Sequence, residues 1–448
     1  MIQLRQYAPA ALRSEAVRTS LAVLMLNGAG LILAYGVQFL IARLSGAEAF
    51  GQFVAATVWI QAVSQVFATG FALTALRVVA EARDDRNSVV EQQFIGFFAV
   101  LLGFGAAAGL AIAATVMGKG LGTIGLLIWL GIVGNALITL LGGLVRGYGQ
   151  TTASILPERL GRDTVALIVV ASVLSMTGAL LAWQALLAYV LGVWLAGAAL
   201  LVIWNRAHHW QTAGFWTALV NADAGRRYRQ WMGLHSNLAA TKLAGIGLAR
   251  GDLIILSLIA APDQVGIYAS ALLIATGMQQ LTLAADLVVS PRLAHHAVRN
   301  DTSAMERAFA RVARGLTLSS VALALVLIAL GQPLLSWLGD AFTAGYDLLL
   351  IFVARSFLTN GLGSISVLLN LTGHHRVATI IMAVHALALA PSVWLAFQAM
   401  GITGAALAAS VIAVSAQVVL AIAVHRRVGV NPWRWIIDLA GPSPERTS

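Results

Sequence analysis

The sequence has no cysteine and few charged residues, which make up 10% of its 448 residues. Without cysteine, the chain forms no disulfide bond and no thiolate metal site. A soluble domain carries roughly 25% charged residues, so the low charge excludes a water-exposed globular protein. The patterns G-x-x-x-x-G-K-[ST], H-E-x-x-H and G-x-S-x-G are also missing, which excludes the nucleotide-hydrolysing and hydrolase sites that they mark.

The chain is instead rich in apolar residues, because 59% of its residues are hydrophobic and its mean hydropathy is +0.84. A helix needs about 20 apolar residues to cross the hydrocarbon core of a bilayer. The sequence therefore predicts an all-α polytopic membrane protein with twelve transmembrane helices. They are expected near residues 19–43, 51–75, 93–117, 121–143, 163–182, 184–204, 234–260, 264–290, 312–335, 345–371, 377–397 and 402–424.

The basic residues predict how the chain is oriented. Cytoplasmic loops carry an excess of Lys and Arg. If the N-terminus is cytoplasmic, Arg43 and Lys119 are the only two of the 28 basic residues in outer loops, and Lys242, Arg250 and Arg355 are the three inside helices. Both termini are therefore expected in the cytoplasm. The net charge of +10 is then explained by topology and by contact with anionic lipids, without nucleic acid.

An internal repeat is indicated by a shift of 215 residues. The shift places the acidic-x-x-Gly-x-aromatic turn at 48–53 on a second such turn at 263–268. It also pairs Gly30 with Gly245, Gly36 with Gly251, Gln65 with Gln280 and Arg77 with Arg292. Two six-helix bundles of parallel orientation are therefore expected. Their predicted boundaries are an N-terminal bundle at 1–204, a cytoplasmic linker at 205–233, a C-terminal bundle at 234–424 and a cytoplasmic tail at 425–448.

Five charged residues are predicted within helices of the second half: Lys242, Arg250, Asp252, Asp286 and Arg355. A charge in the middle of a transmembrane helix costs about 2.5–3.5 kcal/mol on insertion scales. Each of these five charges is therefore expected to have a structural or functional role. One interpretation is internal pairing, of Asp252 with Arg250 or Arg355 and of Asp286 with Lys242. The other is a cationic interior that binds an anionic ligand, since three cations face two acids. Asp252 and Asp286 are also candidates for proton or sodium coupling, on the basis of their burial alone.

Polar residues recur at helical spacing on several predicted helices, and three of them are candidate substrate contacts: Gln61, Asn135 and Gln279. Such stripes line a wet cavity or hydrogen-bond neighbouring helices. Arg77 and Arg292 close equivalent helices on the cytoplasmic side, as topology anchors or as first contacts for a phosphate. The predicted substrate-binding set is Lys242, Arg250, Arg355, Arg77, Arg292, Gln61, Gln279 and Asn135, with no metal site and no cofactor.

The segment from Leu40 to Glu81 resembles the opening of the bacterial polysaccharide transporters, often called O-antigen flippases. The matching residues are Ala42, Arg43, Gly46, Glu48, Phe50, Gly51, Gly70 and Arg77, with "RGYGQ" at 146–150. This family belongs to the multidrug/oligosaccharidyl-lipid/polysaccharide (MOP) flippase superfamily, together with multidrug-and-toxin extruders and lipid II flippases. The resemblance covers all twelve predicted helices.

The resemblance implies a flippase of the bacterial inner membrane, not an enzyme. Its substrate would be a polyprenyl-diphosphate-linked oligosaccharide, an O-antigen or exopolysaccharide repeat unit, moved by alternating access of the two halves. Partners would include membrane lipids, a polysaccharide polymerase and a chain-length regulator.

Three alternatives to this function are considered. The first is a cation-coupled multidrug antiporter, although helix 1 lacks the carboxylate that such extruders often carry. The second is a lipid II flippase, although that family usually has fourteen helices. The third is a membrane-bound polymerase or ligase, although those enzymes use large outer loops and the outer loops predicted here are short.

Overall fold

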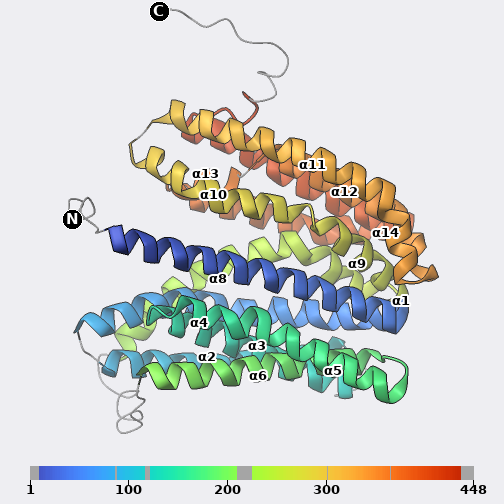
Figure 1. The fold of residues 1–448 in the computed structure, drawn as a ribbon, viewed down its shortest axis with the longest axis horizontal. Coiled ribbons are helices and arrows are strands. Elements are labelled where there is room, and N and C mark those ends of the chain that lie inside the picture. The colour runs from blue at the N-terminus through green and yellow to red at the C-terminus, as the bar shows by residue number, and fades with distance from the viewer. Residues whose placement is uncertain are drawn as a thin grey trace, which may run out of the picture. The chain divides into compact units, whose positions relative to one another are not determined.

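The computed structural model describes residues 10–85, 88–116, 122–208, 224–299, 301–363 and 365–434. Every regular element in these ranges is a helix (Figure 1), which confirms the predicted all-α class. The elements are α1 (Ala10–Asp85), α2 (Ser88–Val116), α3 (Thr123–Gly147), α4 (Thr151–Ile155), the π-helix η1 (Leu156–Gly161), α5 (Arg162–Thr177), α6 (Ala182–His208), α8 (Ala224–Ile259), α9 (Pro262–Thr276), α10 (Gln279–Val298), α11 (Thr302–Leu338), the 3₁₀ helix η2 (Asp340–Gly345), α12 (Tyr346–Gly361), α13 (Ile365–Leu371) and α14 (His375–Val428).

Nine helical segments in the described part of the chain are long and apolar enough to cross a membrane. Two of them join two helices at a kink, where Gly46 (φ 74°) and Gly401 (φ 64°) leave the helical conformation. Positive φ is a conformation that glycine adopts without steric cost. These kinks coincide with two of the predicted turns, and α8 lies outside the nine. The total of twelve spans remains a prediction.

The chain divides into two compact units. Unit 1 contains Met1–Ser45 and Ala56–Lys242, and unit 2 contains Gly46–Ala55 and Leu243–Ser448. Two helices contribute to both units: α1 enters unit 2 at its kink and returns to unit 1 at Ala56, and α8 passes from unit 1 to unit 2 after Lys242. Helix α8 begins at Ala224, within the range predicted as a linker.

Unit 1 has an aromatic core that includes the first turns of α8. Phe71 of α1 packs on Phe94 and Phe98 of α2, and its ring centroid lies 4.3 Å from that of His235 of α8. Trp231 packs edge-on against Phe94 at 5.3 Å. Aromatic pairs of this kind contribute beyond the area they bury, so the first part of α8 is firmly held in unit 1.

In unit 2, the segment Gly46–Ala55 crosses the start of α9 at unusually close range. A Cβ atom on Gly51 would collide with the carbonyl group of Pro262, and one on Gly266 would collide with the carbonyl group of Ala47. The contact is reciprocal, because each glycine meets the residue that corresponds to its partner's neighbour in the repeat. At the shift of 215 residues, Ala47 corresponds to Pro262 and Gly51 corresponds to Gly266. A duplicated hairpin would produce such a contact, so this geometry supports the predicted repeat.

Candidate functional site

Unit 2 contains a buried charged cluster made by α8, α9 and α12. The Tyr268 hydroxyl donates a hydrogen bond to Asp252 Oδ2 at 2.8 Å, and Arg355 Nη1 lies 3.8 Å from the same oxygen. The backbone N–H of Leu253 donates to Asp252 Oδ1 at 2.8 Å. All three polar side chains are buried. A buried carboxylate with a cation and two donors is compensated inside the protein, so this cluster stabilises unit 2.

The cluster shows which of the predicted cations come together. Arg355 pairs with Asp252, as the interpretation of internal pairing predicts. Arg250, on the same helix as Asp252, is exposed. Lys242 is also exposed and is the last residue of its part of unit 1. Asp286 is half-buried on α10. Of the three cations, Lys242 and Arg250 are therefore the ones whose side chains are accessible.

A polar network lies where α9 ends and α10 begins, at an interruption of a predicted transmembrane helix. Asn360 Nδ2 donates to the carbonyl oxygen of Met278 at 2.9 Å and to Ser320 Oγ at 3.0 Å. Thr282 Oγ1 donates to Asn360 Oδ1 at 2.8 Å. The Asn360 side chain is buried, so its amide satisfies polar groups of α10, of α11 and of the turn between α9 and α10 in an environment without water. Gln279, a predicted substrate contact, is half-buried beside this interruption.

Replacing Asn360 with leucine is expected to lower the free energy of unfolding in detergent by about 1 to 2 kcal/mol, because the hydroxyls of Ser320 and Thr282 lose their partner. Thermal unfolding of the purified protein measures the change. Thr359→Ala is the matched control, since the Thr359 hydroxyl bonds only the carbonyl of Ser356 one turn earlier and its loss should be nearly neutral. Equal stabilities of the two variants would contradict the role of the network.

Unit 1 carries charged residues that the sequence predictions placed in a loop. The helix expected at 163–182 begins twelve residues earlier, because α4, η1 and α5 form one continuous segment over 151–177. Four charges lie inside this segment: Glu158, Arg159, Arg162 and Asp163. Charged residues within the helices are therefore not confined to the second half of the chain.

Two of these charges neutralise each other tightly. Arg162 Nε and Nη2 donate to the two carboxylate oxygens of Asp163 at 2.8 and 3.0 Å. The guanidinium also lies 5.7 Å from the centre of the Tyr189 ring on α6. A bidentate pair on an aromatic face is a strong arrangement, so it holds α5 and α6 together. Gln61, a predicted substrate contact, is exposed on α1.

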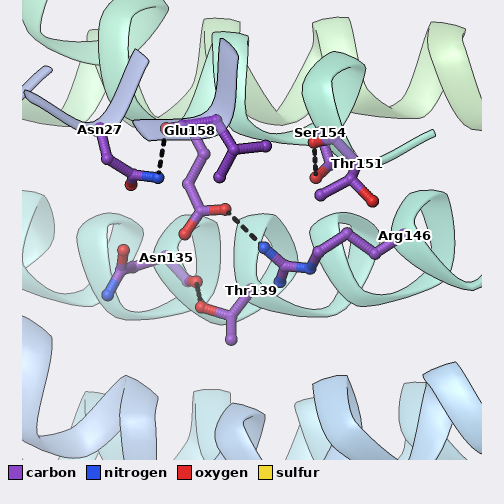
Figure 2. Close-up of polar contacts among 8 residues, drawn as sticks. Asn27, Asn135, Thr139, Arg146, Thr151, Ser154 and Glu158 are labelled. Atoms are coloured by element: carbon purple, nitrogen blue, oxygen red, sulfur yellow. Dashed lines mark hydrogen bonds and ion pairs between the residues drawn. The ribbon is translucent and has the colours of Figure 1, made fainter. Parts of the chain in front are cut away.

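The other charged pair is looser (Figure 2). Glu158 extends from η1 toward Arg146 on α3, and the single contact joins Arg146 Nη1 to Glu158 Oε2 at 3.4 Å. Asn135 and Thr139 lie on the same helix as Arg146. Asn135 is buried, and its Nδ2 donates to Ser64 Oγ at 2.7 Å. Asn135 therefore links two helices of unit 1. This contact is the one expected if the polar stripes hydrogen-bond neighbouring helices.

Sequence reasoning found some of these residues and missed others. Tyr268 is the aromatic residue of the repeated turn at 263–268 but is not in the predicted site, and the pair of Arg146 and Glu158 is not predicted at all. The side chains of Arg77 and Arg292 lie outside the described part of the structure. Within the described ranges, no group of three or more His, Asp or Glu residues is arranged to hold a metal ion.

Comparison with solved structures defines the class of the fold. The chain is similar to the lipid II flippase MurJ in an inward closed conformation, with a TM-score of 0.69 and 11% identity over 93% of this chain and 91% of that one. It is similar to a MATE family multidrug transporter in an inward-facing conformation, with a TM-score of 0.62 and 12% identity over 92% and 98%. A MOP superfamily transporter from Pyrococcus furiosus aligns with a TM-score of 0.55 and 12% identity over 92% and 95%. The fold is that of the MOP superfamily.

The family follows from the sequence itself. Residues 16–297, more than half of the chain, match the family described as polysaccharide biosynthesis protein, and the chain belongs to that family. No curated protein sequence matches it significantly. The chain is therefore a multi-pass membrane protein of this family, with nine candidate membrane spans in its described part and a fold shared with a flippase and with multidrug transporters.

Proposed function

We propose that this protein moves a polyprenyl-diphosphate-linked oligosaccharide, an O-antigen or exopolysaccharide repeat unit, from the cytoplasmic to the outer leaflet of the bacterial inner membrane. The observation that carries the proposal is the membership of a polysaccharide biosynthesis family in a chain whose fold is shared with a lipid flippase. Both termini are cytoplasmic in this proposal. A polysaccharide polymerase and a chain-length regulator that use the product are the expected partners.

The physical task explains why accessible cations matter. Each sugar hydroxyl costs several kcal/mol when it enters hydrocarbon without a partner, and a diphosphate costs more because it is charged. Lys242 and Arg250 are exposed on α8 and are eight residues apart, which is roughly 12 Å along a helix. We assign these two residues to the diphosphate or to an acidic sugar. Arg355 is assigned to the support of Asp252, with which it is buried.

Transport is proposed to proceed by alternating access of the two halves, as in other transporters built from repeats. Coupling to a proton or a sodium ion is assigned to Asp286, a half-buried carboxylate on α10. Asp252 is the other candidate, and a cation that binds its Oδ2 would compete there with Arg355 and with the Tyr268 hydroxyl.

Removing the accessible cations is expected to stop export. In cells whose only copy of the gene carries Lys242→Ala and Arg250→Ala, surface polysaccharide should fall at least about tenfold, since each charged contact to a phosphate is worth roughly 1.5–3 kcal/mol. Lipid-linked oligosaccharide should accumulate inside. Immunoblots of surface polysaccharide and extraction of the lipid fraction measure both effects.

The matched control is Arg229→Ala, which removes an exposed arginine near the start of the same helix and should leave export unchanged at equal protein level. Normal export in the double variant would remove Lys242 and Arg250 from the mechanism. Cation-dependent efflux of dyes from vesicles, without any effect on polysaccharide, would instead favour the multidrug antiporter that the fold also accommodates.

A further inference from the structure

We propose that Arg146, in unit 1, is a further anion-binding residue, and that Glu158 masks it until an oxyanion of the substrate takes its place. Glu158 thus competes with the substrate for Arg146, because the ligand binds Arg146 only when it displaces Glu158. This inference rests on the proposed function, because it assumes that the substrate carries phosphate or carboxylate groups. It concerns residues that belong to neither the predicted nor the proposed binding set.

The segment at 151–177 takes part in two ion pairs, one within it and one with Arg146 of α3, and the two differ in geometry. Arg162 and Asp163 make two short contacts, and their side chains are 20% and 8% exposed. Arg146 and Glu158 make one contact of 3.4 Å, and their side chains are 28% and 24% exposed. A long single contact at a partly exposed position contributes little. The first pair is therefore built to stay closed, whereas the second can open at low cost.

A glycine lies beside the pair. Gly142 lies one helical turn before Arg146 on α3, and a Cβ atom there would be 3.3 Å from Arg146 Nη2 and 3.3 Å from Glu158 Oε2. A larger residue would therefore crowd the point where the guanidinium meets the carboxylate. Figure 2 shows Glu158 reaching Arg146 from the facing helical segment. Because position 142 has no side chain, the carboxylate, or an oxyanion in its place, can approach Arg146 closely.

Glu158 is carried by a well-packed backbone. It lies in η1, the π-helix, and π-helical turns occur frequently at functional sites. The backbone that follows it is held by close packing: Gly30 of α1 approaches the Cβ and carbonyl of Arg159, and Gly192 of α6 approaches the carbonyl of Arg162. Because the backbone is fixed, exchange requires rotation of the Glu158 side chain and no rearrangement of the helix.

The chemistry favours exchange when a phosphate arrives. A guanidinium binds phosphate or carboxylate through two parallel hydrogen bonds, and Glu158 supplies only one long contact. The ligand therefore replaces one weak interaction with two strong ones. Arg146 stays neutralised before and after the exchange, so the site never presents an uncompensated cation inside the protein.

The test is binding of geranylgeranyl diphosphate to the purified full-length protein in lipid nanodiscs, measured by calorimetry, with geranylgeraniol as the uncharged comparison. Glu158→Gln is expected to bind the diphosphate roughly three- to five-fold more tightly than wild type, as expected for loss of a competing, partly exposed ion pair. Arg146→Gln should bind at least about tenfold more weakly. The double variant should match Arg146→Gln, since Glu158 has nothing left to mask.

Arg146→Lys guards against misfolding of the glutamine variant, because it keeps the charge and loses the planar fork; its affinity should lie between those of wild type and Arg146→Gln. A gain from Glu158→Gln that persists in the Arg146→Gln background reflects general electrostatics and overturns the masking. Wild-type binding that neither variant alters overturns this inference and leaves the proposed function standing. Absence of any preference of wild type for the diphosphate over geranylgeraniol overturns both.

Discussion

Asp252→Ala is expected to lower the free energy of unfolding in detergent by about 3–5 kcal/mol, because it leaves the Arg355 guanidinium buried without its counter-charge. The Tyr268 hydroxyl loses its acceptor in the same step. Arg355→Ala should cost a similar amount by stranding the carboxylate. Thermal unfolding of the purified variants and their steady-state amounts in membranes measure the effect.

The double variant Asp252→Asn with Arg355→Gln separates pairing from packing. It removes both charges and keeps most of the buried volume, so it should regain most of the stability lost in either single alanine variant. Asp263→Ala is the control carboxylate, since Asp263 is exposed in the first turn of α9 and its loss should cost less than about 1 kcal/mol. A single variant as stable as wild type would show that the buried pair does not hold unit 2 together.

Gly51→Ala and Gly266→Ala are expected to have the second large effect, with a loss of about 3 kcal/mol each. The added methyl group would collide with the carbonyl of Pro262 in the first case and of Ala47 in the second. Backbone carbonyls cannot move aside as flexible side chains do, so this overpacking falls at the costly end of its range. Thermal unfolding in detergent is again the measurement.

Gly28→Ala and Gly245→Ala are matched controls, because both glycines are helical and a Cβ atom on either meets nothing within 4 Å. They should be neutral or stabilising by about 0.4–1 kcal/mol. If the two hairpins are duplicates, Gly51→Ala and Gly266→Ala should cost similar amounts. A tolerated alanine at both positions would show that the two helices are not held at the distance described here.

The sequence was sufficient for the class of fold and for the position of its main turns. Long apolar stretches have one stable solution in a bilayer, a helix whose backbone groups bond each other, so the all-α prediction was secure. The turn before Gly51 was found because its pattern occurs twice, and the chain does kink there, at Gly46. The close approach of Gly51 and Gly266 was not foreseen, although both glycines had been noted as repeat partners.

The candidate sites were predicted less well, for a physical reason. Position along a helix gives depth in the membrane, but it does not tell which neighbour a side chain meets. Arg250 and Arg355 therefore looked equivalent in the sequence, yet one is exposed and the other is buried against Asp252.

Glu158, Arg159 and Arg162 precede the apolar stretch at 163–182, so the sequence places them in the loop before that predicted helix. Pairing between Arg162 and Asp163 and the π-helical turn make that segment compatible with a helix. Both errors arise from contacts between residues, which composition and spacing do not encode.

The passage of α1 and α8 between the units has a mechanical consequence. The chain crosses between the units three times. At Ala55–Ala56 and at Lys242–Leu243 it crosses within unbroken helix, whereas at Ser45–Gly46 it crosses where Gly46 leaves the helical conformation. In the proposed alternating access, movement would therefore bend continuous helix at two crossings, which resist sharp bending, and could change the backbone dihedrals of a glycine at the third.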